Sequence, residues 1–180
     1  MIVALFGLSE MVISGSKRSG TNSAATDRGS YWVFRIGIPC ALALAFVLAI
    51  RVPQAHLDGG LAVDALAVGL FIVGTALRWA SIIHLGRFFT VDVAIAPDHR
   101  IIDTGPYRYL RHPSYTGGLT AFLGLGFALH NWLSLLALML PVLAIHLYRM
   151  GVEEQALAQG LGEPYRAYAR RTRRLIPGVY

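Results

Sequence analysis

Four apolar stretches constrain the fold of this chain more than any other feature of its sequence. They cover residues 31–50, 61–83, 113–129 and 132–148, with lengths of 20, 23, 17 and 17 residues. The hydrocarbon core of a bilayer is about 30 Å thick, and a helix needs about 20 residues to cross it, with about 17 as the lower limit. We therefore expect an all-α integral membrane protein, a helical bundle of about four transmembrane helices.

The composition supports a membrane protein. Hydrophobic residues make up 55% of the chain and charged residues only 14%, whereas a soluble domain is about one quarter charged. The single cysteine excludes a disulfide framework and a cysteine-based zinc site. His84 and His146 lack a spaced set of partner ligands, so we predict no metal site.

The basic residues predict the orientation in the membrane. They are 15 arginines and one lysine, and the net charge is +6. They concentrate before the first span, between the second and third, and after the fourth, which places both termini and the segments 84–112 and 149–180 in the cytoplasm. This bias accounts for the positive charge without nucleic acid, which is therefore not an expected partner. The excess of arginine over lysine indicates a GC-rich bacterial genome, so we expect a bacterial plasma membrane.

The short connection between the last two spans predicts how the polar segments meet. Only His130 and Asn131 separate these spans, so they form an antiparallel hairpin, and residues 84–112 and 149–180 reach the same membrane face. Residues 1–14 are apolar but lack the basic start of a signal peptide. Residues 15–30 are rich in serine, glycine and threonine, which predicts a flexible linker. We expect a stub and linker over 1–30, and one membrane domain with a cytoplasmic cap over 31–180.

Polar residues gather where the third span begins. Gly105-Pro106 is a turn signal, His112 precedes a proline and so avoids helical geometry, and Pro113 suits the first position of a helix. A helix N-terminus flanked by Arg111 and His112 favours an anion. The alternative is an interfacial belt, with Arg111 extended to the membrane surface beside Tyr107, Tyr109 and Tyr115.

A second group of polar residues follows the fourth span. Arg149 and Glu153 lie four apart, on one helix face, while the adjacent Glu153 and Glu154 face different directions. The alternative is an ordinary exposed helix with salt bridges. Gly162 ends this helix, and the basic run from Arg170 to Arg174 is expected mainly to contact anionic lipid headgroups.

Together these segments resemble the isoprenylcysteine carboxyl methyltransferase family of integral membrane enzymes. The resemblance rests on HRIIDTGPYRYLRHPSYTGG (His99 to Gly118), a short helical hairpin, and RMGVEEQALAQGLGEPYRAY (Arg149 to Tyr168), about half of the chain. The chain is much shorter at its N-terminus than the eukaryotic members, and its acidic run has only two glutamates.

The resemblance implies methyl transfer from S-adenosylmethionine to a lipophilic acceptor, most simply carboxyl O-methylation of an isoprenylcysteine-like substrate that enters from the bilayer. It implies that Arg149 is the catalytic residue that holds the substrate. The cofactor would be bound by His99, Arg100, Ile101, Ile102, Tyr107, Arg111, His112, Pro113, Ser114 and Glu153.

The chemistry fits a membrane site. Methyl transfer from a sulfonium to a carboxylate turns two opposite charges into neutral products, which a dry site favours, and the carboxylate is already ionised at neutral pH. Three alternatives remain open at this point. The first is a phospholipid N-methyltransferase or thiol S-methyltransferase on the same scaffold. The second is an NADPH-dependent enzyme similar to sterol reductases, which share the C-terminal IPxxY ending, here Ile176 to Tyr180. The third is a membrane scaffold without enzymatic activity.

Overall fold

The computed structural model describes residues 29–89 and 100–178. Within these residues the chain is helical and contains no β-strand, which confirms the expected all-α bundle. The helices are α3 (Ser30–Arg51), α4 (Gly60–Leu85), α5 (Pro113–Ala128), α6 (Trp132–Leu161) and the short α7 (Glu163–Arg171). Three single 3-10 turns join them: η1 (Pro53–Ala55), η2 (Gly86–Phe88) and η3 (Gly105–Arg108).

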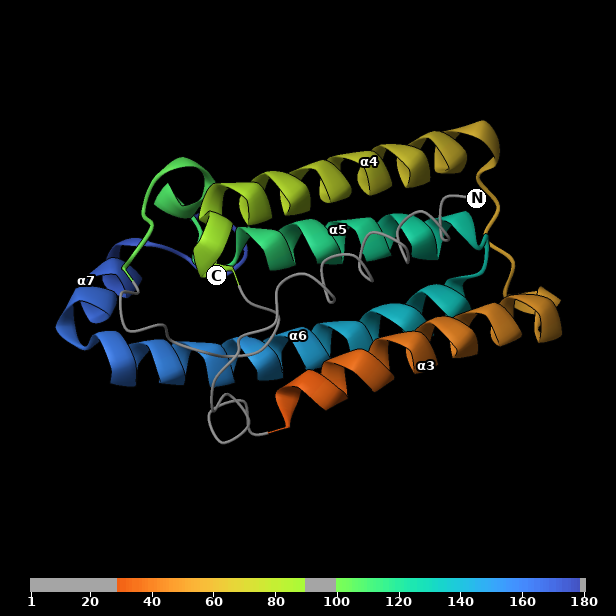
Figure 1. The fold of residues 1–180 in the computed structure, drawn as a ribbon. Coiled ribbons are helices and arrows are strands. Elements are labelled where there is room, and N and C mark those ends of the chain that lie inside the picture. The colour runs from red at the N-terminus through yellow and green to blue at the C-terminus, as the bar shows by residue number, and fades with distance from the viewer. Residues whose placement is uncertain (1–28, 90–99, 179–180) are drawn as a thin grey trace.

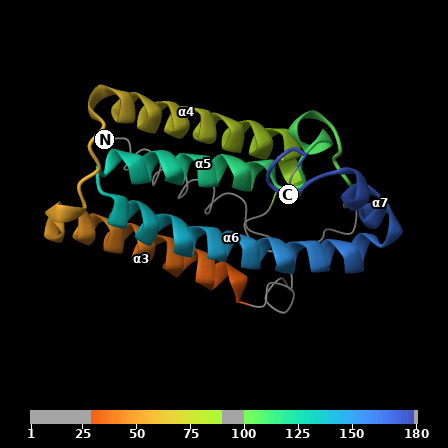
Figure 2. The same cartoon turned by 180° about the vertical axis from the view of Figure 1, so that it is seen from behind.

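The long helices pack as two antiparallel pairs. Helix α4 packs against α5 and α3 against α6, while α5 and α6 join the two pairs (Figure 1), and the view from behind shows the same order (Figure 2). Side chains from α3, α5 and α6 form the apolar core, including Ala45, Ala121, Leu138 and Val142. Interdigitation of these small and branched side chains holds the two pairs together.

The outer surface of the bundle is apolar, as expected of a protein in lipid. Exposed side chains on α4 include Leu61, Ile72, Val73 and Ile83, a pattern that water would not favour. Within the part of the chain that the structure describes, three helices are long and apolar enough to cross a membrane, namely α3, α4 with its η2 extension, and α6. Helix α5 has 16 residues, just below the usual length, and packs between α4 and α6.

The helix ends follow the local sequence signals. His112 has non-helical dihedrals (φ −125°, ψ 54°), and Pro113 begins α5 as predicted. In the α5–α6 turn His130 has a positive φ of 49°, and the Asn131 side chain caps α6 by accepting a hydrogen bond from the backbone N–H of Ser134 at 2.9 Å. Helix α6 continues past its apolar part as far as Gly162, so Arg149 and Glu153 lie on the helix that forms the fourth span.

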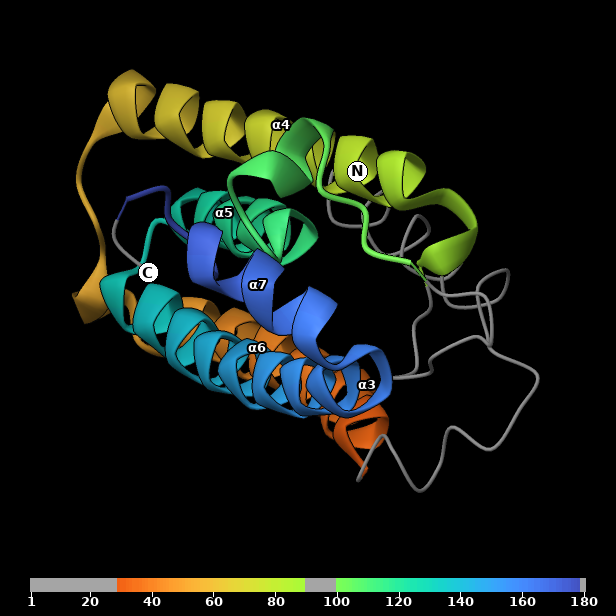
Figure 3. The ribbon, with the colours of Figure 1, turned by 90° about the vertical axis from the view of Figure 1, so that its left-hand side faces the viewer.

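The C-terminal segment is fastened to the beginning of α5. The backbone N–H of Arg111 donates to the carbonyl oxygen of Arg173 at 2.7 Å, and that of His112 to Arg174 at 3.2 Å. The Thr116 hydroxyl donates to the Leu175 carbonyl oxygen at 2.8 Å. Figure 3, which looks onto this end of the bundle, shows α7 lying over the ends of α5 and α6. The two polar segments therefore meet at one end of the molecule, as the hairpin predicts.

Candidate functional site

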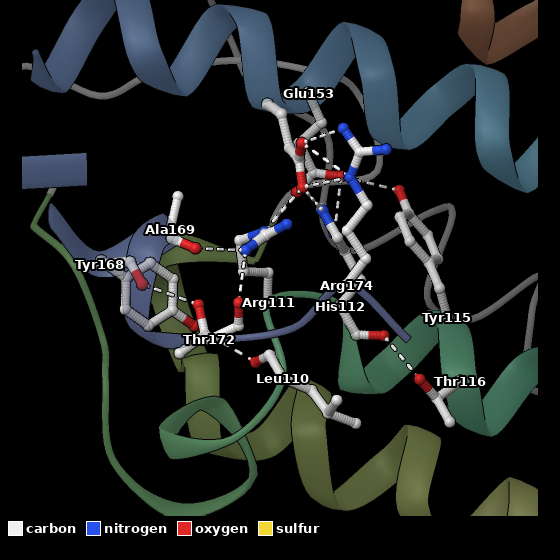
Figure 4. A network of polar contacts seen from close by, with 11 residues as sticks. Leu110, Arg111, His112, Tyr115, Thr116, Glu153, Tyr168, Ala169, Thr172 and Arg174 are labelled. Atoms are coloured by element: carbon white, nitrogen blue, oxygen red, sulfur yellow. Dashed lines mark hydrogen bonds and ion pairs between the residues drawn. The ribbon is translucent and has the colours of Figure 1, made fainter. Parts of the chain in front are cut away.

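Figure 4 shows a network of charged side chains at this end that includes Arg111, His112 and Arg174. The carboxylate that these three residues share belongs to Glu154. Its Oε1 accepts a hydrogen bond from Arg111 Nε at 2.8 Å and lies 3.2 Å from His112 Nε2. Its Oε2 accepts from Arg174 Nη2 at 2.8 Å. Burial raises the pKa of Glu154, but the hydrogen bonds from His112, Arg174 and Arg111 outweigh it and lower the pKa to about 2. A charged carboxylate therefore ties α6 to the start of α5 and to the C-terminal segment.

Arg111 fixes the position of α7. Besides Glu154, its guanidinium donates to the carbonyl oxygens of Ala169 at 2.6 Å and Thr172 at 2.7 Å. Tyr168 reinforces this attachment, since its hydroxyl lies 2.8 Å and 3.2 Å from the carbonyl oxygens of Tyr107 and Leu110. Burial raises the pKa of Tyr168 above its usual value, so this hydroxyl stays a donor. Arg111 thus has three acceptors within the protein itself.

Glu153 is the more accessible of the two adjacent glutamates. Its Oε2 accepts a hydrogen bond from the Tyr115 hydroxyl at 2.9 Å and lies 3.9 Å from His112 Nδ1. One third of the Glu153 side chain is exposed, against 15% for Glu154. The two carboxylates therefore face different partners, as adjacent helical positions predict, and His112 lies between them.

Arg149 lies one turn before Glu153 and deeper in the bundle. It is only 5% exposed, its Nη1 donates to Ser30 Oγ at 2.9 Å, and its guanidinium lies 5.8 Å from the centre of the Phe34 ring. It also interacts with the Tyr115 hydroxyl. Tyr115 therefore links a buried guanidinium on one side to the half-buried Glu153 carboxylate on the other.

Arg78 is a buried charge near the end of the second span, and it is not among the site residues predicted from the sequence. It lies in α4, is 6% exposed, and donates from Nη1 to the Ser114 carbonyl oxygen at 3.3 Å. An arginine within an apolar span is itself a signal of a structural or functional role. The sequence analysis also missed the roles of Tyr115, Glu154 and Arg174, which depend on contacts between distant segments.

The structure brings most of the predicted site residues together. Those that gather around the start of α5 and the end of α6 are Tyr107, Arg111, His112, Pro113, Ser114, Arg149 and Glu153. Arg100 is exposed and Ile101 and Ile102 are half-buried, in the segment that precedes η3. His99 lies outside the described residues. The contacts of these residues with a cofactor remain predictions.

The basic run at the C-terminus has partners within the protein, and its expected contact with lipid headgroups stays a prediction. Arg170 pairs with Glu163 at 2.7 Å, Arg171 pairs with Asp103, and Arg174 pairs with Glu154 at 2.8 Å. Arg173 is exposed, but its backbone pairs with that of Arg111. Arg171 and Arg174 therefore attach the C-terminal segment to other parts of the chain, whereas Arg170 pairs within α7, a distribution that the charge pattern alone does not show.

Comparison with known proteins gives consistent matches. The model of the isoprenylcysteine carboxyl methyltransferase family matches residues 67–159, slightly more than half of the chain. A protein-S-isoprenylcysteine O-methyltransferase B from Arabidopsis thaliana is 35% identical over 112 residues, which cover 61% of this chain and 57% of the Arabidopsis protein. A probable protein-S-isoprenylcysteine O-methyltransferase from Oryza sativa subsp. indica is 28% identical over 183 residues, which cover 98% of this chain and 93% of the rice protein.

A solved structure shares the fold. It is that of a eukaryotic intramembrane Ras methyltransferase, an isoprenylcysteine carboxyl methyltransferase, with a TM-score of 0.72 and 23% sequence identity. The match covers 99% of this chain and 64% of the solved chain. This chain thus spans less than two thirds of the length of that protein and of the Arabidopsis relative, while its four-helix arrangement with a C-terminal cap lies within the shared fold.

Proposed function

The chain belongs to the isoprenylcysteine carboxyl methyltransferase family, and we propose that it methylates the carboxyl group of an isoprenylcysteine-like acceptor with S-adenosylmethionine as the methyl donor. The observation that carries this proposal is the Arg149–Tyr115–Glu153 linkage, which places a buried cation beside an accessible carboxylate. Family membership supports a methyltransferase over the reductase and scaffold alternatives.

The residues around Glu153 fit the cofactor. S-adenosylmethionine supplies an activated methyl group on a positive sulfur and also carries an amine, hydroxyls and a carboxylate. Glu153 offers an accessible acceptor for the amine or hydroxyls, and the buried Tyr165 hydroxyl has no hydrogen-bond partner among the described residues. We propose both as cofactor contacts, together with the predicted His99, Arg100, Ile101, Ile102, Tyr107, Arg111, His112, Pro113 and Ser114.

Arg149 fits the acceptor carboxylate. A guanidinium binds a carboxylate through two parallel hydrogen bonds, which fixes the orientation of the carboxylate as well as its position. Burial strengthens this interaction because little water competes for it. Holding the reacting atoms in line lowers the barrier by several kcal/mol, so we expect Arg149 to orient the nucleophile while the packed end of the bundle excludes water.

The membrane arrangement adds further proposals. We propose one membrane domain over residues 31–180, with the site and both termini on the cytoplasmic face of a bacterial plasma membrane. The lipophilic acceptor would reach Arg149 from the bilayer, and membrane lipids would surround the exposed apolar faces of α3, α4 and α6.

The test is methyl transfer from isotope-labelled S-adenosylmethionine to an S-prenylated N-acylcysteine in lipid nanodiscs. A carboxyl product releases labelled methanol in base, whereas N-methyl and S-methyl products do not, so the assay separates the proposed acceptor class from the alternatives. We expect Arg149→Ala to lower kcat/KM at least about 100-fold, because the bound carboxylate loses the guanidinium proposed to orient it.

Two variants complete this test. Arg149→Lys keeps the charge but loses the planar fork, so we expect an activity well below the wild type. The matched control is Arg166→Ala, which removes an exposed arginine from α7 and should leave kcat/KM unchanged. Full activity in Arg149→Ala, or a product stable to base, would contradict the proposal.

A further inference from the structure

His146 carries a buried nitrogen that the function proposed so far does not use. The residue lies on α6, three positions before Arg149, and is fully buried. Its Nδ1 lies 2.7 Å from the Val142 carbonyl oxygen, and because a carbonyl only accepts, Nδ1 is the donor. In the neutral ring Nε2 is then an acceptor, and this atom has no hydrogen-bond partner among the described residues. A buried acceptor without a partner is costly and requires an explanation.

The surroundings of Nε2 leave room for a small group. A Cβ atom at Gly118 on α5 would lie 3.7 Å from His146 Nε2 and 3.5 Å from Arg78 Nη1, which is ordinary van der Waals contact. The glycine therefore leaves a space about the size of a methyl group beside the acceptor. The rings of Phe34 and Tyr115 lie 5.0 and 5.4 Å from the imidazole, centre to centre. The acceptor thus lies in an aromatic environment on the bilayer side of Arg149.

We propose that His146 Nε2 accepts a hydrogen bond from an amide N–H of the acceptor substrate while Arg149 holds its carboxylate. Side chains three apart on a helix lie about 5–6 Å from each other at Cβ. The N–H and carboxylate of a C-terminal amino acid are bonded to the same carbon. Their separation therefore suits binding by two neighbouring side chains such as His146 and Arg149. The inference rests on the proposed function and assigns to His146 the recognition of the amide that lies beside the acceptor carboxylate.

A preference for the amide follows from the cost of a buried group without a partner. An acid without the amide leaves Nε2 unpaired in the complex, and a site with a dedicated hydrogen-bonding group discriminates against such an analogue. The hydrogen bond forms in the ground state as well as during reaction, so its loss should raise KM and leave kcat unchanged. His146 is thereby a positioning and specificity residue.

The experiment compares two probes in nanodiscs. One is S-farnesyl-N-acetylcysteine, and the other is S-farnesyl-3-mercaptopropionate, which keeps the prenyl chain, thioether and carboxylate but lacks the amide. We expect the wild type to favour the first by about tenfold in kcat/KM, the effect of one hydrogen bond. His146→Leu should raise KM for the amide probe about tenfold and leave the other probe within about twofold.

Conservative variants separate this role from a structural one. His146→Gln places an amide near the position of Nε2 and should retain part of the preference, whereas His146→Asn reaches only the position of Nδ1 and should behave like His146→Leu. If His146→Leu does not fold, Gly118→Ala provides the test, since its methyl group fits sterically and occupies the space beside Nε2. It should also reduce the preference for the amide probe.

The outcomes are distinguishable. Equal losses on both probes, or equal use of both probes by the wild type, would overturn the role of His146 while leaving the proposed function intact. Transfer to neither probe by folded wild-type protein that binds S-adenosylmethionine would overturn the proposed function and this inference with it. A selective loss on the amide probe that His146→Gln partly restores would establish the inference.

Discussion

At the scale of single residues, Glu154 is predicted to hold the C-terminal segment in place. Its carboxylate pairs with Arg111, His112 and Arg174 and is only 15% exposed. Glu154→Gln removes the negative charge that these three groups share. We expect a loss of about 1–3 kcal/mol in the free energy of unfolding, measured by thermal unfolding in detergent, and faster protease cleavage after Arg173 and Arg174.

The pH dependence of stability provides a second measurement of the same residue. Hydrogen bonds lower the pKa of Glu154 from 4.5 to about 2, so its stabilising effect is complete above about pH 4.5 and is lost as the pH falls towards 2. Glu154→Gln should lack this part of the acid sensitivity. The matched control is Glu163→Gln, which removes an exposed pair with Arg170 and should change stability by less than about 0.5 kcal/mol. Equal effects of the two substitutions would contradict the prediction.

The site residues that could be predicted are those that follow the chain in regular steps. Arg149 and Glu153 lie four positions apart on α6, and the sequence from Arg111 to Pro113 predicts the start of a helix. The partners of Glu154 could not be predicted in this way, because they come from segments 20 to 43 positions away. Only the folded chain shows that Arg174 pairs with this carboxylate.

At the scale of helices, the close contact of α4 and α5 depends on glycine. A Cβ atom at Gly117 would lie 2.5 Å from the backbone nitrogen of Arg78, and one at Gly74 would lie 2.4 Å from that of Ala121. Backbone atoms cannot move aside as a flexible side chain can. We expect Gly117→Ala to cost about 1–3 kcal/mol, measured as a lower midpoint of thermal unfolding in detergent, and to displace Arg78 from the Ser114 carbonyl oxygen.

Gly69→Ala is the control for this contact. Gly69 also lies in α4, but a Cβ atom there would meet nothing within 4 Å. Because alanine is the better helix former by about 1 kcal/mol, we expect unchanged or slightly higher stability. A midpoint that falls as far in Gly69→Ala as in Gly117→Ala would show that the α4–α5 contact is not the cause.

The sequence located the helices better than it located their contacts. Apolar runs, Pro113 and the His130-Asn131 turn define the spans, because the bilayer and the backbone impose these signals locally. The burial of Arg78 was not predicted, since it depends on the close approach of α4 and α5 at Gly74 and Gly117. The extension of α6 beyond Tyr148 to Leu161 carries the site residues out of the apolar stretch, and hydropathy alone does not reveal that the helix is continuous.

At the scale of the whole molecule, the two ends of the bundle differ in charge. The end with α7 carries Arg108, Arg111, Arg166 and the run from Arg170 to Arg174, whereas the opposite end carries Arg51, His56, Asp58, Asp64 and His130. Arginine-rich ends remain on the cytoplasmic side during insertion. The α7 end, with Arg149 and Glu153, is therefore predicted to face the cytoplasm.

Thiol labelling in intact cells tests this orientation. The native Cys40 is exposed on α3, so Cys40→Ala removes the background. Asp58→Cys and Gln159→Cys then place one thiol at each end, both at exposed positions. A membrane-impermeant reagent should label only Asp58→Cys in intact cells, and both variants once the membrane is permeabilised. Labelling of Gln159→Cys alone in intact cells would reverse the topology. The arginines of the α7 end would then serve only to hold the cap through Glu154, Glu163 and Asp103, and a water-soluble cofactor would have to reach Glu153 from outside the cell.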